Sequence, residues 1–319
     1  MYTLGIETSC DETSVSVTNG NDVLSNIVTS SVHLHSKYGG VVPEIASRFH
    51  LEYINPVLKK SLKTAGITLK DIELVAVTKE PGLVGSLLVG VSMAKALSFS
   101  LSVPLIEVDH LIAHLYANYM CYRDISFPVI GLVVSGGHTS IMLMDDIDKQ
   151  KVLGRTQDDA AGEAFDKVAK ILGLGYPGGP IIEKRALSGD AGKIRFPRSF
   201  IKKGSLDFSF SGIKTAVLYY VNRHKSSGLN EAVINDICAG FQEAVCDMIV
   251  DNALLACRKS KISTLVIGGG VSANVRLRDR LTQEAEKWSI RVSSPPLKLC
   301  LDNAAMIGGL GEALYKKRS

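Results

Sequence analysis

The sequence predicts an α/β protein made of two half-molecules of related design, and two internal correspondences support this prediction. Residues 4–18 and 130–144 each have the pattern of a strand, a polar turn and a second strand. Residues 74–97 and 264–281 each have the pattern of an apolar strand, a glycine-containing loop and a helix. A duplicated architecture follows from this repeat.

The composition is compatible with two domains of ordinary size in a chain of 319 residues. With 46% hydrophobic and 21% charged residues, it is typical of a soluble globular protein, and a net charge of +4 permits a nucleic-acid partner without indicating one. The N-terminal run MYTLGIETSCDE lacks the basic and apolar regions of a signal peptide. Six scattered cysteines without a CxxC pair indicate reduced, mostly buried thiols. We therefore expect a cytoplasmic protein.

The longest apolar run in the first half is LVGSLLVGVSMA at residues 83–94. It is too short to span a bilayer and is followed by Lys95, so we predict a buried helix. In the second half the matched elements are further apart, which predicts an insertion within residues 154–230. There, residues 158–172 have helical periodicity, with Asp158 or Asp159 as the N-cap, and the run GYPGGP ends this helix.

The pair His110 and His114, in the run DHLIAH, is the most informative local feature. On a helix, a spacing of four residues places both imidazoles on one face, where they can share a metal. A zinc protease of the HExxH kind has Glu after the first His, but this chain has Leu111. Asp302, in LCLDNAAMIGGLG at the start of an apolar helix, is a candidate third ligand. The alternative is a pair of structural histidines, one capping a helix and one packed in a core.

Four small-residue turns could admit phosphate, because backbone amides without a nearby Cβ approach oxygen closely. They lie at residues 8–13, 135–139, 176–180 and 268–270, distributed over both halves, and they indicate a bound nucleotide. No GxxxxGK[ST] run occurs, which excludes a P-loop enzyme. GGGVSA at 268–273 is a poor dinucleotide fingerprint, and no acidic residue follows it at the expected distance.

A set of motifs resembles a known family: GIETSCDETS, GGVVPEIASRFH, PGLVGSLLVG, SGGHT, DDAAGEAFDKVAKILGLGYPGGP, FSFSGIKT, GGGVSAN and LDNAAMIG. Together with the histidine pair, they are similar to the tRNA N6-adenosine threonylcarbamoyltransferases, once described as O-sialoglycoprotein endopeptidases. The resemblance implies the actin-like ATPase, sugar kinase and Hsp70 fold, with two duplicated lobes and a cleft between them. We expect an N-terminal lobe over residues 1–128, with the C-terminal helix 301–319 packing back on it. The C-terminal lobe is expected over 129–300, with a helical insertion around 154–230.

The resemblance also implies the reaction. A threonylcarbamoyl group would pass from threonylcarbamoyl-AMP to N6 of adenosine 37 in tRNAs that read codons beginning with A. A divalent metal, Fe²⁺ or alternatively Zn²⁺, maps onto His110, His114 and Asp302. The implied partners are a shorter same-fold paralogue and a P-loop ATPase in bacteria, with no membrane, and helices including residues 44–64 are the expected interface.

The donor's binding residues map onto a set in the second half: Val134, Ser135, Gly136, Gly137, His138, Asp166, Gly179, Glu183 and Asn274. Amides of residues 135–138 would cradle the phosphate, Asp166 and Glu183 would accept hydrogen bonds from the ribose, and Asn274 suits an adenine edge or a phosphate. Asp11 or Glu12 is the expected catalytic base. The structural alternatives are two turn acids, a solvated helix residue at 166 and a helix cap at 274.

The segment KIRFPRSFIKK interleaves cationic with aromatic side chains, namely Lys193, Arg195, Phe196, Arg198, Phe200, Lys202 and Lys203. It could bind the anticodon arm through phosphate contacts and stacking, and the alternative is a solvated basic loop. Three positions depart from the family pattern, namely Glu80 and Ala113 in place of glycines and Asp109 in place of asparagine. An added carboxylate at Asp109 would orient an imidazole or change the metal preference. A metal-dependent glycoprotein endopeptidase, a small-molecule kinase and a non-catalytic scaffold remain alternatives.

Overall fold

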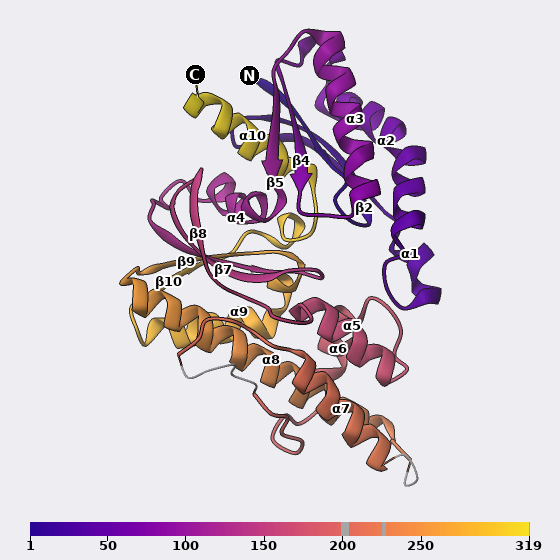
Figure 1. Cartoon of the computed structure of the whole chain (residues 1–319), viewed down its shortest axis with the longest axis vertical. Helices are drawn as coiled ribbons and strands as arrows, with labels where there is room; N and C mark the ends of the chain where they lie inside the picture. The colour runs from indigo at the N-terminus through magenta and orange to yellow at the C-terminus, as the bar shows by residue number, and fades with distance from the viewer. Residues whose placement is uncertain (199–203, 225–227, 319) are drawn as a thin grey trace. The chain divides into compact units, whose positions relative to one another are not determined.

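The computed structural model describes residues 1–198, 204–224 and 228–318. The chain divides into two compact units: unit 1 comprises Met1–Ile125 and Pro295–Ser319, and unit 2 comprises Ser126–Ser294. Each unit is built on one five-stranded mixed sheet with helices packed against it (Figure 1).

The sheet of unit 1 has the order β3-β2-β1-β4-β5. Its strands are β1 (Tyr2–Glu7), β2 (Glu12–Asn19), β3 (Asp22–Ser30), β4 (Leu74–Glu80) and β5 (Leu105–Asp109). β1 pairs antiparallel with β2 and parallel with β4, and β4 pairs parallel with β5. The carboxyl ends of three strands therefore lie at one edge of the sheet, where α/β proteins usually place their ligands. The helices are α1 (Val32–His35), α2 (Pro43–Ala65), α3 (Val84–Leu101), α4 (His110–Cys121) and α10 (Ala304–Arg318).

The sheet of unit 2 repeats this order as β8-β7-β6-β9-β10. Its strands are β6 (Val129–Val134), β7 (Thr139–Asp146), β8 (Lys149–Arg155), β9 (Thr264–Gly268) and β10 (Arg291–Ser293). β6 pairs antiparallel with β7 and parallel with β9, as β1 pairs with β2 and β4. Both internal correspondences predicted from the sequence are therefore confirmed, the second one as β4–α3 and β9–α9.

In the described part of unit 2, four helices lie between β8 and β9: α5 (Ala161–Ile171), α6 (Gly178–Ala186), α7 (Ser211–His224) and α8 (Glu231–Ser260). A further helix, α9 (Val275–Glu286), follows β9. The predicted N-cap of α5 is wrong, because the cap is Ala160. Asp158 instead accepts the Phe210 amide at 2.8 Å, and Asp159 pairs with Lys214 at 2.6 Å. The run GYPGGP follows α5 as expected, but α6 already begins within it.

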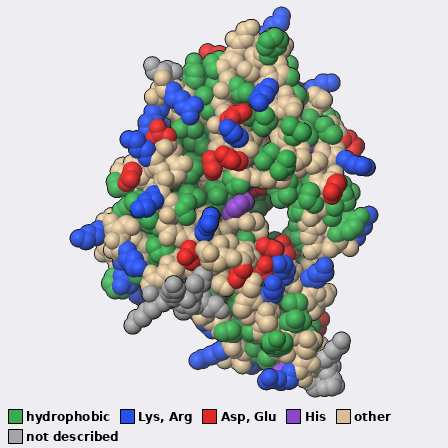
Figure 2. Space-filling view, viewed as in Figure 1, with side chains coloured by type: hydrophobic (Ala, Val, Ile, Leu, Met, Phe, Trp, Pro, Cys, Tyr) green, Lys and Arg blue, Asp and Glu red, His purple; other side chains and the backbone are tan. Residues whose placement is uncertain are grey.

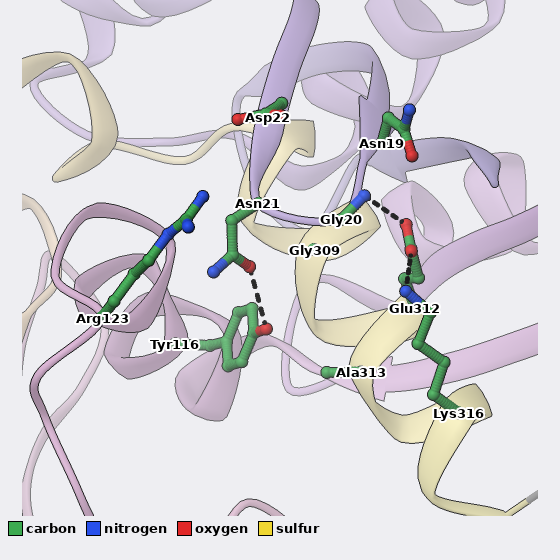
Figure 3. Close-up of a pocket in the computed structure, with 10 residues that line it drawn as sticks. All are labelled: Asn19, Gly20, Asn21, Asp22, Tyr116, Arg123, Gly309, Glu312, Ala313 and Lys316. Atoms are coloured by element: carbon green, nitrogen blue, oxygen red, sulfur yellow. Dashed lines mark hydrogen bonds and ion pairs between the residues drawn. The ribbon is translucent and has the colours of Figure 1, made fainter.

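Helix α10 packs against β1, β2 and β4 of unit 1. Gly5 and Gly308 permit this close approach, since a Cβ on Gly5 would collide with the Ala304 carbonyl and one on Gly308 would lie 2.8 Å from Thr18 Oγ1. The Ala304 amide donates to Ser14 Oγ at 2.9 Å and fixes the start of the helix. Further along, Glu312 accepts the Gly20 amide at 2.8 Å beside a cavity of about 390 Å³ (Figure 3).

Helix α3 forms as expected, but the prediction that it is buried is wrong. Its buried residues are the small Ser86, Gly90 and Ala94, whereas Val84 is 84% exposed and Phe99 is 89% exposed. The small residues let one face pack closely, and Val89, Met93 and Leu97 also contact the core of unit 1. Val84, Leu88 and Phe99 point outward. By length and composition α3 is the one described helix that could cross a membrane, a test that many helices of soluble proteins also pass.

The surface charge is mixed. On the face shown in Figure 2, lysine and arginine side chains are interspersed with acidic and hydrophobic ones and do not gather in one basic stripe. This agrees with the small net charge of the sequence.

Candidate metal centre and nucleotide-binding turns

The two histidines of the DHLIAH run lie one turn apart at the start of α4, directly after β5. Asp109 starts this helix by accepting the Ile112 amide at 2.9 Å, which places His110 at its first position. The ring centroids of His110 and His114 are 4.6 Å apart, and both side chains are buried. Asp109 thus serves as the N-cap of α4.

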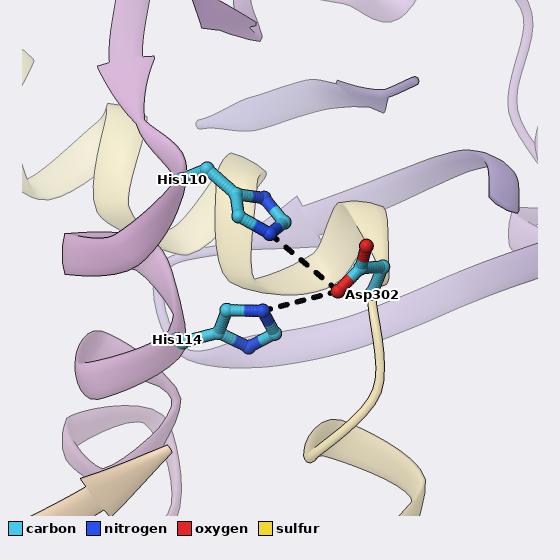
Figure 4. A group of neighbouring side chains, drawn as sticks. All are labelled: His110, His114 and Asp302. Carbon is cyan, nitrogen blue, oxygen red and sulfur yellow. Dashed lines mark hydrogen bonds and ion pairs between the residues drawn. The ribbon is translucent and has the colours of Figure 1, made fainter. Parts of the chain in front are cut away.

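Asp302 approaches both histidines from the segment that leads into α10 (Figure 4). Its Oδ1 lies 3.1 Å from His114 Nε2 and 3.5 Å from His110 Nε2. The three ligand atoms lie within 4.8 Å of one another. The sequence predicted Asp302 at the start of the helix, and this prediction is wrong. Helix α10 begins at Ala304, and Asn303 Oδ1 accepts the Met306 amide. The fold nevertheless brings together all three residues that the sequence analysis proposed as ligands.

The spacing of these atoms fits a divalent metal ion. Nitrogen and oxygen ligands lie about 2.0–2.2 Å from zinc, so two neighbouring ligands on one ion are roughly 3–3.5 Å apart. Two imidazoles and one carboxylate suit Fe²⁺ or Zn²⁺ and leave coordination positions open, which is typical of catalytic sites.

The electrostatics of the cluster also favour a cation. Burial opposes ionisation of Asp302, but the two imidazoles outweigh it and hold the pKa of this carboxyl well below its usual range. Burial likewise disfavours a charged His110, yet the neighbouring carboxylates raise its pKa well above the ordinary value. Burial and the neighbouring His110 lower the pKa of His114. The carboxylates of Glu7 and Asp302 thus favour a positive charge on His110, and a bound metal ion would supply that positive charge instead.

Glu7 is the second of those carboxylates, and the sequence analysis did not identify it. It ends β1, is fully buried, and its Oε2 lies 2.9 Å from His110 Nδ1. Thr78 Oγ1 donates to the same oxygen at 2.6 Å. An acidic residue at the end of an otherwise apolar strand is the signal that could have drawn attention to it.

The turn after Glu7 carries the two expected catalytic acids. Asp11 is half-buried, and Glu12 begins β2, where Ser30 Oγ donates to its Oε1 at 3.0 Å. Burial and the nearby Asp11 raise the pKa of Glu12 well above its ordinary value. A carboxylate with a raised pKa is a better proton acceptor. His50 of α2 holds the turn, with Nδ1 2.7 Å from Thr13 Oγ1 and Nε2 3.0 Å from the Cys10 carbonyl.

In unit 2 the turn after β6 contains the residues Val134 to His138. The Ser135 amide donates to the His138 carbonyl at 2.8 Å and closes the turn. A Cβ placed on Gly136 or Gly137 would meet no atom within 4 Å, and the same is true of Gly179 at the start of α6. These three glycines therefore leave open space beside the backbone, as an anion would require.

The other expected donor-binding residues each have a structural contact. Asp166 Oδ1 accepts the Gly178 amide at 2.7 Å, so it links α5 to α6 and is not merely a solvated helix residue. Glu183 Oε1 accepts the Val275 amide at 2.7 Å. Asn274 caps α9 by accepting the Leu277 amide at 2.9 Å, as its structural alternative predicted, and donates to Gln242 Oε1.

Part of the basic segment is used inside unit 2. Lys193 pairs with Asp236 at 3.1 Å, and Arg198 pairs with Asp247 at 2.7 Å. Phe196 is buried, whereas Arg195 is exposed. Phe200, Lys202 and Lys203 lie outside the described residues. Of the other departures from the family pattern, Glu80 is exposed and Ala113 is buried in α4.

Comparisons with known proteins agree with these features. A family model described as tRNA N6-adenosine threonylcarbamoyltransferase matches residues 22–309. A protein of Thermosipho africanus (strain TCF52B) with the same name is 50% identical over 317 residues, which are 99% of this chain and 95% of that protein.

Two solved structures match the fold. Full-length HypF in its phosphate- and nucleotide-bound form has a TM-score of 0.64 and 16% identity, over 99% of this chain and 46% of that chain. The (R)-2-hydroxyglutaryl-CoA dehydratase component A of Acidaminococcus fermentans has a TM-score of 0.57 and 18% identity, over 99% of this chain and 98% of that chain. The expected actin-like ATPase, sugar kinase and Hsp70 fold class is thereby confirmed.

Proposed function

Because the chain belongs to the tRNA N6-adenosine threonylcarbamoyltransferase family, we propose that it transfers a threonylcarbamoyl group from threonylcarbamoyl-AMP to N6 of adenosine 37. The acceptors are tRNAs that read codons beginning with A. The observation that carries this proposal is the match at 50% identity over 99% of the chain. The cluster of His110, His114 and Asp302 supports it independently, since it is a suitable metal site within the same chain.

His110 Nε2, His114 Nε2 and an Asp302 oxygen would hold one divalent metal ion, which we propose to be Fe²⁺, with Zn²⁺ as the alternative. When bound, the metal supplies Lewis-acid polarisation of a carbonyl oxygen and a positive charge for an anionic group of the donor. His110 and His114 come from α4, and Asp302 lies two residues before α10, whose start Asn303 fixes by accepting the Met306 amide, so their positions are preorganised.

The acceptor amine must lose a proton during the transfer. N6 attacks the carbonyl carbon of the threonylcarbamoyl group, a C–N bond forms, and the C–O bond to the phosphate of AMP breaks. AMP leaves with the electron pair, and the proton of N6 passes to a base. We assign this role to Glu12, because its raised pKa makes it a stronger base than an ordinary glutamate, with Asp11 as its neighbour in the turn.

Unit 2 would bind the adenylate part of the donor. The amides of Gly136 and Gly137 would donate to its phosphate, because these glycines leave space beside the backbone, whereas the amides of Ser135 and His138 close the turn. Asp166 and Glu183 would accept from ribose hydroxyls, and Asn274 would contact the adenine or the phosphate. Gly179 would allow the ligand to approach the start of α6.

The test is nucleoside mass spectrometry on an unmodified tRNA of this set, incubated with threonylcarbamoyl-AMP, the bacterial partner proteins and this chain. We expect threonylcarbamoyladenosine with the wild type and none with His110→Ala. His33→Ala, at an exposed histidine of the same unit, is the matched control and should retain activity. Absence of product with the wild type, when another family member forms it under the same conditions, would contradict the proposal.

The exposed apolar face of α3 is our candidate docking surface for the shorter same-fold partner. Leu88, Val84 and Phe99 of α3 are at least 64% exposed, and Leu51 of the neighbouring α2 is 64% exposed. Exposed apolar side chains in such number usually mark an interaction surface. Leu88→Asp should abolish copurification with the paralogue, whereas Val152→Asp, at a half-exposed position of unit 2, should not. Equal binding by both variants would place the partner elsewhere. We propose that the P-loop ATPase joins the complex of this chain and the shorter same-fold partner.

We also propose that the enzyme acts in the cytoplasm, where tRNA is modified. A metal-dependent glycoprotein endopeptidase is not favoured, because the named relatives are transferases and Leu111 occupies the position of the peptidase base.

A further inference from the structure

Glu7 is a fully buried carboxylate whose oxygen atoms are all engaged by donors within unit 1. Its Oε2 lies 2.9 Å from His110 Nδ1 and accepts from Thr78 Oγ1 at 2.6 Å. Its Oε1 accepts the Ser9 amide at 2.5 Å. A buried ionised carboxylate is strongly unfavourable unless such donors surround it, so these contacts define its position closely.

The contact with Glu7 distinguishes the two nitrogen atoms of His110. A neutral imidazole carries one N–H, and the nitrogen that faces a carboxylate is the one that donates. Both nitrogens of His110 face a carboxylate, Nδ1 that of Glu7 at 2.9 Å and Nε2 that of Asp302 at 3.5 Å. A metal ion that replaces the proton at Nε2 would leave the Nδ1–H donating to Glu7 and the Nε2 lone pair directed to the metal. His114 differs, because its Nδ1 is buried and has no hydrogen-bond partner among the residues that the structure describes.

We propose that Glu7 is a positioning residue of the metal site, which fixes the Nδ1–H tautomer of His110 and so directs Nε2 toward the metal. This inference rests on the proposed function, because it presupposes that His110 is a ligand. Through the Ser9 amide, the same carboxylate also fastens the start of the turn that carries Asp11 and Glu12. One side chain thus sets the position of a metal ligand and of the turn beside it.

The chain offers a matched control for Glu7. Glu312 in α10 of the same unit is 1% exposed and is likewise held by a threonine hydroxyl and a backbone amide. Its Oε2 accepts from Thr3 Oγ1 at 3.1 Å and from the Gly20 amide at 2.8 Å, and Lys316 replaces the histidine as its charged partner (Figure 3). Substitution of Glu312 therefore reproduces the loss of a buried carboxylate without touching a metal ligand.

The experiment titrates the full chain with Co²⁺, follows the visible absorption of the bound ion, and measures affinity by competition with a chelator. Glu7→Gln keeps the shape but removes the charge, and we expect Co²⁺ affinity to fall by about 10- to 100-fold, with an altered spectrum. Glu312→Gln should bind Co²⁺ within about twofold of the wild type and with its spectrum, although both variants are less stable.

Thr78→Val is the second variant, because it retains the Glu7 charge and removes only the hydroxyl that donates to Oε2. It should weaken Co²⁺ binding several-fold. It provides the test of the proposal if Glu7→Gln does not fold. If Glu7→Gln binds Co²⁺ with wild-type affinity and spectrum, the proposed role of Glu7 is overturned, while the metal assignment stands. Where Glu7→Gln is unfolded, the same result in Thr78→Val would overturn that role. An equal loss in Glu312→Gln would overturn it as well. A wild-type protein that binds no Co²⁺ would overturn the metal assignment and this role together.

Discussion

In unit 1 the turn between β1 and β2 is fastened by titratable side chains, whereas in unit 2 the matching turn between β6 and β7 is fastened by backbone and hydroxyl groups. His50 contacts Thr13 and the Cys10 carbonyl in unit 1, and Glu7 accepts the Ser9 amide. In unit 2 the Ser135 amide donates to the His138 carbonyl, and Thr139 Oγ1 accepts the Ala161 amide at 2.9 Å.

The difference shows how one duplicated sheet can serve two kinds of chemistry. Charged side chains around the first turn suit a metal ion and proton transfer, because they can hold a cation and accept a proton. A turn in which Gly136 and Gly137 leave open space beside the backbone suits a phosphate, because it offers amide donors and no negative charge. If this division is correct, changes in one unit should impair one ligand and spare the other.

The largest expected effect is on metal affinity. Asp302→Ala removes one of the three proposed ligands, and we expect the affinity for Zn²⁺ or Co²⁺ to fall on the order of 10³-fold. Binding of AMP should remain within about twofold, because the proposed nucleotide residues all lie in unit 2. Metal and AMP titrations of the same preparation check this. Asp236→Ala, at a buried carboxylate of unit 2, is the control and should leave metal binding intact.

The reciprocal change is Gly137→Val in unit 2. The structure has free space where the new Cβ would lie, so the fold should tolerate the side chain while the ligand loses access to the amides. We expect AMP affinity to fall by about 10- to 100-fold, the equivalent of one or two hydrogen bonds to a charged group, with metal affinity unchanged. Gly162→Val is the contrast, since its Cβ would lie 2.8 Å from the Gly136 Cα, and it should lower stability as well. Unchanged AMP binding in Gly137→Val would remove the phosphate from this turn.

The sequence predicted the parts of this comparison that depend on local pattern. The strand, turn and strand repeat and the spacing of His110 and His114 are properties of a few consecutive residues. Asp302 is 188 positions from His114, and it was found by its apolar surroundings and by the family motif. The contacts of Glu7 to Thr78 and His110 span 71 and 103 positions, and no local pattern encodes them. Similarly, the apolar composition of α3 predicted the helix but could not show that Val84, Leu88 and Phe99 face outward.

The pH dependence of stability should distinguish the two turns. Burial lowers the pKa of His50, although its hydrogen bond to the Cys10 carbonyl opposes this. The unfolded chain therefore takes up a proton more readily than the folded one, with an unfolded pKa of about 6.5. The contribution of His50 to stability is complete above that pH and is lost as the pH falls below it.

Two variants distinguish the titration of His50 from the loss of a hydrogen bond that does not titrate. His50→Gln should cost about 1–2 kcal/mol at pH 7.5 through lost hydrogen bonds and should flatten the decline in stability between pH 7 and pH 5. Thr139→Val in unit 2 should cost a similar amount without changing that decline, because the lost group does not titrate. Urea unfolding at a series of pH values measures both. The same slope in His50→Gln and the wild type would show that other groups cause the acid sensitivity.

The smallest effect is expected where unit 2 does carry clustered charges, between α8 and α9. Arg280 pairs with Glu243 and lies 2.8 Å from Asp247, and Arg276 bonds the same glutamate. These side chains are partly exposed, so solvent screens them, and Arg280→Met should cost only about 0.5–1 kcal/mol. The loss should shrink in 1 M salt, where the screening length is about 3 Å. Urea unfolding at two salt concentrations checks this, and AMP and metal affinities should not change. A cost of several kcal/mol would instead mean that unit 2, like unit 1, depends on buried charge, and the contrast between the two units would then be confined to their turns.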